Sequence, residues 1–151
     1  MNQNKTDILL IEDNADDAGL VIRALRKHDP GTSVLHLSNG EEALKYLLRE
    51  RTQQEPDPFD LPRLILLDLK MPKVDGLELL SRLKTDQRTR EVPVVMLTSS
   101  NQSSDIQASY RLGANSYIVK PVEFDGFAKV VAGISQYWLQ LNHSPQIEKN
   151  N

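Results

Sequence analysis

The sequence contains no cysteine among its 151 residues. Disulfide bonds and thiolate metal sites are therefore excluded, and this absence fits a reducing compartment. No apolar run approaches the length of about 20 residues that a membrane-spanning helix needs. The polar start, residues 1–7, lacks the charged beginning, long apolar run and cleavage site of a secretion signal. We therefore expect a soluble, cytoplasmic protein without a membrane partner.

A surplus of positive charge is also missing, because 18 Lys and Arg residues face 21 Asp and Glu residues. A surface that binds nucleic acid is normally basic, so the net charge of −3 argues against a nucleic-acid partner. The length fits one ordinary domain with one core. We expect residues 1–151 to form a single domain, with a core from about 5 to 141 and a polar tail at 142–151.

Short apolar runs alternate with amphipathic segments five times along the chain. The run at 64–67 has no polar interruption, which is typical of a strand covered on both faces of a parallel sheet. Between the runs, apolar residues recur at the three- and four-residue spacing of a helix. The alternation predicts an α/β domain with a doubly wound parallel sheet. The predicted strands are 8–11, 32–37, 64–67, 92–98 and 116–119.

Turn and cap signals separate the predicted elements. Either Asp13 or Asn14 can cap the first helix, and Gly113 suits the end of the fourth helix. The segment 51–62 contains three prolines without periodicity, and it is the longest predicted loop. A domain boundary is the alternative there, but too little chain precedes this segment to close a core.

Chemically active side chains follow four of the predicted strands. The first strand is followed by Glu12 and Asp13 and the third by Asp68, while Thr98 ends the fourth and Lys120 follows the fifth. One such acid is ordinary, because Asp often only caps or turns a loop. The carboxyl ends of parallel strands share one edge, where ligands bind in open α/β sheets. We therefore expect all five side chains to converge.

Phosphoryl transfer to a carboxylate is the chemistry that requires this combination. Clustered acids repel one another unless a cation neutralises them, and oxygen ligands favour Mg²⁺, for which Mn²⁺ can substitute. The ion would also screen the repulsion between a phosphoryl group and Asp68, the carboxylate nucleophile. Lys120 supplies a fixed positive charge, and Thr98 can donate a hydrogen bond to a phosphoryl oxygen.

At these residues the sequence resembles the receiver domains of two-component response regulators. The resemblance covers roughly residues 5–137, and the ordered set of motifs is more specific than any one of them. The motifs are Ile11-Glu12-Asp13-Asn14, Leu67-Asp68-Leu69-Lys70-Met71-Pro72 with Asp75-Gly76, Leu97-Thr98-Ser99-Ser100, and Gly113-Ala114-Asn115-Ser116-Tyr117-Ile118-Val119-Lys120-Pro121.

The resemblance implies a flavodoxin-like (βα)5 fold with strand order 2-1-3-4-5. It implies that a sensor histidine kinase phosphorylates Asp68, and that Asp68, Thr98 and Lys120 carry the chemistry. It also implies a magnesium site formed by Asp13, Asp68 and the main-chain carbonyl of Lys70, with Glu12 acting through water. Autophosphorylation from small donors and autodephosphorylation are the only catalysis expected of such a protein.

The resemblance also implies a conformational switch. Thr98 would move onto the phosphoryl group, and Tyr117 would turn inward behind it. Lys120-Pro121 matches a position where the family usually has a cis peptide, which would help aim Lys120. The side chain of Lys70 lies two residues beyond Asp68, and we hypothesise that it tunes the lifetime of the phosphoryl group.

A narrower resemblance points to the stand-alone response regulators that serve cyanobacterial and bacterial phytochromes. It rests on the long loop 51–62, on Leu61-Pro62-Arg63 before the central strand, and on Tyr137-Trp138 near the end. It makes a phytochrome the candidate sensor kinase. Too few residues follow the last helix for a DNA-binding module, so we expect output through a partner surface; the sequence does not identify the downstream protein.

The aromatic stripe of the last predicted helix has two interpretations. Most of it must pack on the sheet as core. Its far end, with Tyr137, Trp138 and Leu141, could instead form an exposed apolar patch for a partner. From this end we predict a homodimer.

Two other classes of function compete with the phosphorylated switch. A nucleotide hydrolase would need a phosphate-binding G-x-x-x-x-G-K-[ST] loop, and the sequence has none. Phosphatases with an aspartate nucleophile usually carry a second Asp two residues later, where Lys70 stands here. A receiver-like module that binds partners without phosphorylation is the remaining alternative, and the complete acid, hydroxyl and lysine set argues against it.

Overall fold

The computed structural model describes residues 5–48 and 61–145. Nearly all of the predicted loop 51–62 and the end of the predicted polar tail lie outside these residues. None of the helices in the described part of the chain combines the length and hydrophobicity that crossing a bilayer requires.

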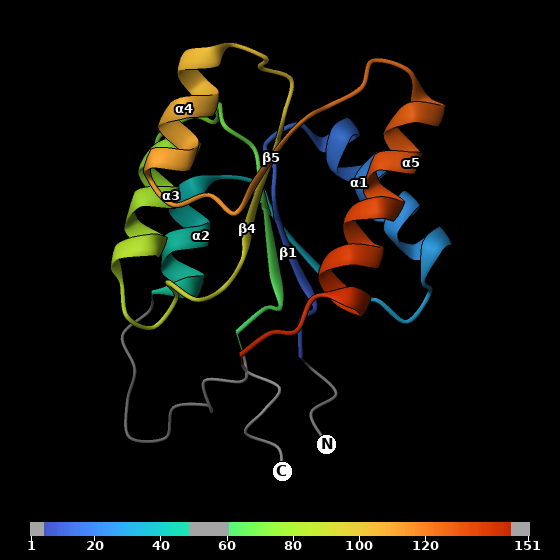
Figure 1. Ribbon diagram of the computed structural model, residues 1–151, viewed down its shortest axis with the longest axis horizontal. Helices are drawn as coiled ribbons and strands as arrows, with labels where there is room; N and C mark the ends of the chain where they lie inside the picture. The colour runs from blue at the N-terminus through green and yellow to red at the C-terminus, as the bar shows by residue number, and fades with distance from the viewer. Residues whose placement is uncertain (1–4, 49–60, 146–151) are drawn as a thin grey trace.

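A five-stranded parallel sheet forms the centre of the molecule, with strand order β2-β1-β3-β4-β5 (Figure 1). This order confirms the predicted flavodoxin-like topology. Neighbouring strands are paired so that Ile11 lies beside Leu67, at the same carboxyl edge of the sheet. The strands are β1 Ile8–Ile11, β2 Val34–Leu37, β3 Leu64–Leu67, β4 Val94–Thr98 and β5 Ser116–Val119.

Helices cover both faces of this sheet. In Figure 1, α1 and α5 lie on one face, and α2, α3 and α4 lie on the other. Successive residues of β1 and β3 point into two separate apolar clusters, so uninterrupted apolar runs are buried on both sides. The helices are α1 Ala15–His28, α2 Gly40–Leu47, α3 Gly76–Thr85, α4 Ser103–Arg111 and α5 Phe124–Ser135.

Two strands begin later than predicted. The N–H of Thr32 donates to the carbonyl of Asp29 at 3.1 Å, so Thr32 belongs to the turn after α1 and β2 begins at Val34. Pro93 has no N–H to donate to a neighbouring strand, and β4 begins one residue after it.

Helix caps fix the directions in which the chain leaves the sheet. The Oδ1 atom of Asn14 accepts the N–H of Asp17 at 3.0 Å, which decides between the two candidate caps of α1. The Oδ1 atom of Asp75 caps α3 by accepting the N–H of Glu78 at 2.9 Å. Gly113 follows the end of α4 with φ of 108°, a left-handed conformation that glycine adopts without strain.

The last helix changes its winding where one continuous helix was expected. After α5, residues Gln136–Leu141 form a π-helix, η2, in which Asn142 donates its N–H to the carbonyl of Tyr137. The guanidinium of Arg63 donates to the carbonyl of Leu139, so the segment before β3 is tied to η2. One sequence feature that suggested the narrower resemblance thus contacts the element that carries the other, Tyr137-Trp138.

Candidate functional site

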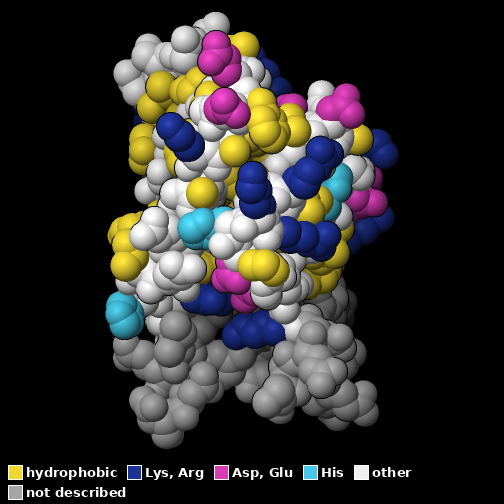
Figure 2. Space-filling model, turned by 90° about the vertical axis from the view of Figure 1, so that its right-hand side faces the viewer, with side chains coloured by type: hydrophobic (Ala, Val, Ile, Leu, Met, Phe, Trp, Pro, Cys, Tyr) yellow, Lys and Arg dark blue, Asp and Glu magenta, His cyan; other side chains and the backbone are white. Residues whose placement is uncertain are grey.

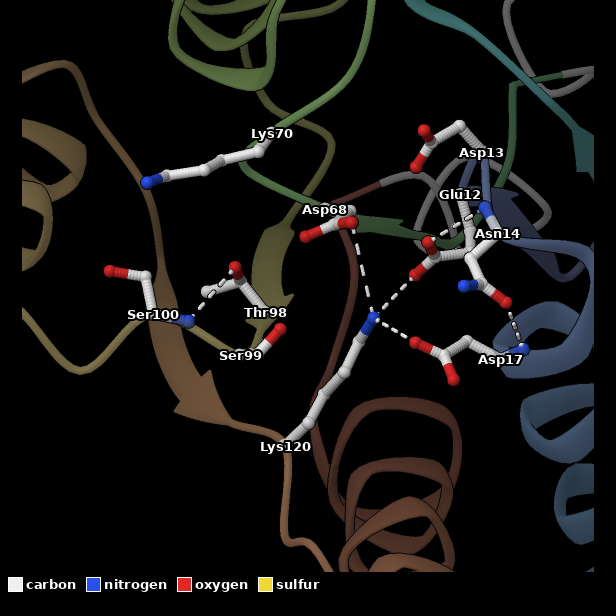
Figure 3. Close-up of a pocket in the computed structure, with 10 residues that line it drawn as sticks. All are labelled: Glu12, Asp13, Asn14, Asp17, Asp68, Lys70, Thr98, Ser99, Ser100 and Lys120. Atoms are coloured by element: carbon white, nitrogen blue, oxygen red, sulfur yellow. Dashed lines mark hydrogen bonds and ion pairs between the residues drawn. The ribbon is translucent and has the colours of Figure 1, made fainter.

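A pocket opens at the carboxyl ends of β1, β3, β4 and β5 (Figure 3). The parallel pairing of the strands places these ends on one edge, as the sequence predicted. The residues that line the pocket include Glu12, Asp13, Asp68, Lys70, Thr98 and Lys120.

Three acidic side chains meet in this pocket. Glu12, Asp13 and Asp68 each offer one carboxylate oxygen, and these atoms lie within 4.8 Å of one another. Glu12 is 2% exposed, whereas Asp13 lies open to solvent. An all-oxygen donor set of this kind suits a hard divalent cation and offers nothing to a soft one.

Lys120 reaches across the pocket to the acids. Its Nζ atom lies 2.7 Å from Oε1 of Glu12, 2.9 Å from Oδ2 of Asp17 and 3.9 Å from Oδ2 of Asp68. The side chains of Lys120 and Glu12 are only 7% and 3% exposed, so their ion pair is shielded from solvent, whereas Asp17 is 34% exposed. The sequence analysis missed Asp17. The sequence feature that could have identified Asp17 is its position as the second acid in the first turn of the helix that follows Glu12 and Asp13.

Burial and charge shift two ionisable groups of this network. Burial raises the pKa of Glu12 to about 7, against the opposing effect of its hydrogen bond with Lys120, and the nearby charge of Asp68 raises it further. Burial alone would lower the pKa of Lys120, but its hydrogen bonds to Asp17 and Glu12 outweigh burial and raise it. Lys120 therefore stays charged at neutral pH, whereas Glu12 changes its protonation state near pH 7.

The loop after β3 holds Asp68 from its backbone side. The Oδ1 atom of Asp68 accepts the N–H of Leu69 at 2.7 Å, and the N–H of Asp68 donates to the carbonyl of Ile11 at 3.1 Å. Gly76 lies so close that a Cβ atom on it would be 2.3 Å from the carbonyl oxygen of Asp68. Glycine at this position is thus a packing requirement for the loop.

Glu12 is also held from its backbone side. A ring nitrogen of His36, on β2, lies 2.8 Å from the carbonyl oxygen of Glu12. The Oε2 atom of Glu12 accepts the N–H of Asn14 at 3.1 Å, so the carboxylate is oriented by the start of α1 as well as by Lys120. His36 therefore supports the site without lining the pocket.

Hydroxyl groups form the opposite wall of the pocket. Thr98 is buried at the end of β4, and its Oγ1 atom accepts the N–H of Ser100 at 3.3 Å. The hydroxyl of Ser100 donates to Asp105 on α4, and the hydroxyl of Tyr117 donates to the carbonyl of Ser100 at 2.9 Å. Burial also raises the pKa of Tyr117. Thr98 and Tyr117 thus contact the same short loop between β4 and α4.

The structure bears on two further features named from the sequence, Lys70 and the peptide before Pro121. The ammonium of Lys70 points away from the three acids in Figure 3, although its backbone is beside Asp68. The expected cis peptide before Pro121 is wrong, because no described peptide bond is cis. The trans form is the usual one for a proline peptide. Lys120 still reaches the acids, because its N–H donates to the carbonyl of Thr98 at 2.7 Å and fixes the end of β5.

Comparison with known proteins identifies the class to which this fold and pocket belong. A family model described as the response regulator receiver domain matches residues 8–132. The chain therefore belongs to the response regulator receiver domain family, the signalling modules of two-component systems.

Individual relatives cover nearly the whole chain. The probable methanogenesis regulatory protein FilR2 of Methanothrix harundinacea is 41% identical over 138 residues, which are 91% of this chain and 86% of FilR2. Response regulator Rcp1 of Synechocystis sp. is 37% identical over 133 residues, 88% of both chains.

Solved structures agree with these sequence relationships. The phosphorylated cyanobacterial phytochrome response regulator RcpA superimposes with a TM-score of 0.84 at 36% identity, over 93% of this chain and 99% of that one. The Mn²⁺-bound form of Rcp1 gives a TM-score of 0.81 at 35% identity with the same coverage. The likeness to phytochrome response regulators that the sequence indicated is thus confirmed.

Proposed function

We propose that this protein is a response regulator that accepts a phosphoryl group on Asp68 from a sensor histidine kinase. The observation that carries the proposal is the position of the Asp68 carboxylate, which adjoins two further acids and lies 3.9 Å from the ammonium of Lys120. In the transfer, an Asp68 oxygen forms a bond to phosphorus as the bond from phosphorus to the kinase histidine breaks, and the imidazole leaves with that electron pair.

The metal of the site is proposed to be Mg²⁺, with Mn²⁺ as a substitute. Asp13, Asp68 and the main-chain carbonyl of Lys70 would hold it, and Glu12 would act through water. The oxygen donors of the acidic cluster fit such an ion, and the Mn²⁺-bound form of Rcp1 supports a divalent cation by analogy with a relative. A bound divalent ion would supply positive charge against the acids and the incoming phosphoryl oxygens.

The remaining side chains of the site stabilise the charge of the phosphoryl group and change conformation in response to it. Lys120 exchanges part of its contact with Glu12 and Asp17 for a phosphoryl oxygen, which its buried ammonium stabilises. Thr98 donates its hydroxyl hydrogen to another phosphoryl oxygen. When Thr98 moves, it displaces the loop that carries Ser100, because the N–H of Ser100 donates to Thr98. Tyr117 moves with this loop, because the hydroxyl of Tyr117 donates to the carbonyl of Ser100. Phosphorylation thereby biases a two-state equilibrium of the α4 and β5 surface.

A phytochrome is the sensor kinase that we propose as the partner. RcpA, which is described as a cyanobacterial phytochrome response regulator, matches this chain over 93% of its length. We also propose a homodimer that uses the end of the last helix, where Tyr137 is 49% exposed and Leu141 is 61% exposed. Trp138 supports this surface from within, because it is partly buried against the core that the sheet forms with α1 and α5.

Phosphotransfer from an isolated kinase tests this function. A cyanobacterial phytochrome kinase, autophosphorylated with radiolabelled ATP and freed of nucleotide, should pass its label to the wild-type chain and not to Asp68→Asn. Transfer to both chains would refute Asp68 as the acceptor. A wild-type chain that takes label from a small donor but never from this kinase would refute the phytochrome partner and leave the acceptor chemistry standing.

A further inference from the structure

The ammonium group of Lys120 is shared unequally among three carboxylates. Its Nζ atom donates to Oε1 of Glu12 at 2.7 Å and to Oδ2 of Asp17 at 2.9 Å. The Oδ2 atom of Asp68 lies beyond hydrogen-bond distance, at 3.9 Å. Seen from Nζ in Figure 3, the carboxylate of Glu12 lies between those of Asp17 and Asp68. Asp17 therefore attracts the ammonium in a different direction from the residue that is proposed to carry the phosphoryl group.

The contact between Asp17 and Lys120 is built into the fold from both ends. The N–H of Asp17 donates to Oδ1 of Asn14 at 3.0 Å, so the cap of α1 fixes the backbone from which the carboxylate projects. The N–H of Lys120 donates to the carbonyl of Thr98 at 2.7 Å, which fixes the end of β5. With both backbones held, the contact can change only when one of the two side chains moves.

The two acids that accept from Lys120 differ in burial. The side chain of Glu12 is 3% exposed, and its second oxygen accepts the N–H of Asn14. The side chain of Asp17 is 34% exposed. Breaking a buried ion pair leaves an uncompensated charge, whereas a pair with an exposed partner contributes little, because water can replace that partner. Asp17 is therefore the partner that Lys120 can leave at the lower cost.

Open space is available beside Asp17. A second cavity of about 260 Å³ lies next to the acidic pocket, because the two share Asp17, Ser99 and Lys120 as lining residues. The carboxylate of Asp17 thus has room to turn away from the acidic pocket when the ammonium leaves it. The other residues that line this second cavity are Leu20, Pro121, Val122, Phe124 and Phe127.

We propose that Asp17 is a positioning residue, the partner that Lys120 releases when its ammonium moves onto a phosphoryl group on Asp68. This inference rests on the proposed phosphorylation of Asp68 and assigns the residue that opposes it. Lys120 has three N–H donors, and Asp17 competes with the phosphoryl oxygens for one of them. Asp17 therefore stabilises the unphosphorylated state and reduces the strength with which the site holds a phosphoryl group.

Binding of beryllium trifluoride tests this exchange, because the anion becomes a tetrahedral mimic of a phosphoryl group when a carboxylate oxygen binds it. Calorimetric titration at saturating Mg²⁺ gives a dissociation constant for each variant. Asp17→Asn keeps the size of the side chain and removes its charge, so it should bind the mimic about three- to fivefold more tightly, the range for a partly exposed ion pair. Asp17→Glu restores a carboxylate and should return the constant toward the wild-type value.

Asp16→Asn is the matched control for the loss of one negative charge. Asp16 is the other acid in the first turn of α1, it is exposed, and its side chain forms no hydrogen bond or ion pair with a described residue. Figure 2 shows charged side chains of both signs on the side of the molecule where α1 and α5 lie. The loss of one exposed charge there should change the constant less than about twofold. Equal gains in Asp16→Asn and Asp17→Asn would overturn the inference.

The affinity for Mg²⁺ alone separates positioning from a general change of the site. Asp17→Asn should bind Mg²⁺ no more tightly than the wild type, because the released ammonium of Lys120 would repel the ion; tighter Mg²⁺ binding would overturn the inference. If the wild type binds the mimic and Asp17→Asn binds it no more tightly, this inference fails while phosphorylation of Asp68 stands. If the wild type binds Mg²⁺ but not the mimic, both fail.

Discussion

Glu12 connects the electrostatics of the pocket to the stability of the fold. Burial raises its pKa from 4.5 to about 7. Between these values the folded chain binds more protons than the unfolded chain, so the free energy of unfolding falls as the pH rises through this window. At about 1.4 kcal/mol per pKa unit, the loss is about 3 kcal/mol at most. The effect belongs to the metal-free protein, because a bound cation would hold the carboxylate ionised.

Glu12→Gln should flatten this dependence. Urea unfolding in the presence of a chelator, measured at several pH values from 5 upward, compares the variant with the wild type. The free energy of unfolding of the wild type should decline toward neutral pH, and that of Glu12→Gln should decline less. Glu41→Gln serves as the control, because Glu41 is a half-exposed acid on α2 whose removal should leave the slope unchanged. Equal slopes for Glu12→Gln and the wild type would contradict the buried, proton-binding glutamate.

Lys70 is expected to control how long the phosphoryl group survives. Its ammonium points away from the acids, but its flexible side chain starts two residues after Asp68 and lines the same pocket. Contact with the phosphoryl group would hinder attack by water, and an exposed ionic contact is worth up to about 1 kcal/mol. Lys70→Ala should therefore lose its label up to about fivefold faster. Phosphate release after removal of the donor measures this, and equal rates would dismiss the hypothesis.

At the scale of the elements, the packing of α3 on the loop after β3 decides whether Asp68 is held in place. Gly76→Ala would put a methyl group 2.3 Å from the carbonyl oxygen of Asp68, a distance at which backbone atoms must move. We expect a loss of about 2–3 kcal/mol in the free energy of unfolding, together with slower labelling. Chemical denaturation measures the first effect. Gly19→Ala, at an open helical position, should not be destabilised, and a Gly76→Ala variant as stable as the wild type would refute the close approach.

The elements were largely predictable where burial on both faces fixed the pattern. β1 and β3 begin and end where their uninterrupted apolar runs do. The winding of the last helix was not predictable, because Phe127, Val131, Ile134 and Trp138 keep the spacing of an ordinary α-helix into η2. The π-helix also involves a contact distant in sequence, from the side chain of Arg63 to the carbonyl of Leu139, and no local pattern encodes such a contact.

At the scale of the whole molecule, the parallel topology explains why five site residues were foreseen together. Once the strands are parallel, their carboxyl ends share one edge, and Glu12, Asp13, Asp68, Thr98 and Lys120 must approach one another. The contact between Lys120 and Asp17 was harder to predict from the sequence, because Asp17 lies in the first turn of a helix and not at the end of a strand. The peptide before Pro121 was assigned the wrong isomer, because that expectation came from the family and not from any interaction of this chain.

The molecule therefore combines an acidic pocket at one edge of the sheet with exposed apolar side chains on η2. The pocket is the place where phosphorylation is proposed, and the β4–α4 loop connects it to β5 through Tyr117. β5 in turn borders a groove that Tyr137 and Trp138 of η2 also line. We therefore expect a change at Asp68 to reach the proposed dimer surface through the β4–α4 loop and β5.

Intact-mass measurement after incubation with acetyl phosphate tests the acceptor most directly. Wild type should gain the mass of one phosphoryl group when Mg²⁺ is present and none when a chelator removes it. Asp68→Asn should gain nothing in either case, while Asp75→Asn, which alters the cap of α3 outside the acidic cluster, should still be labelled. Labelling of Asp68→Asn, or no labelling of a wild-type chain that demonstrably binds Mg²⁺, would contradict phosphoryl transfer to Asp68 from a small donor.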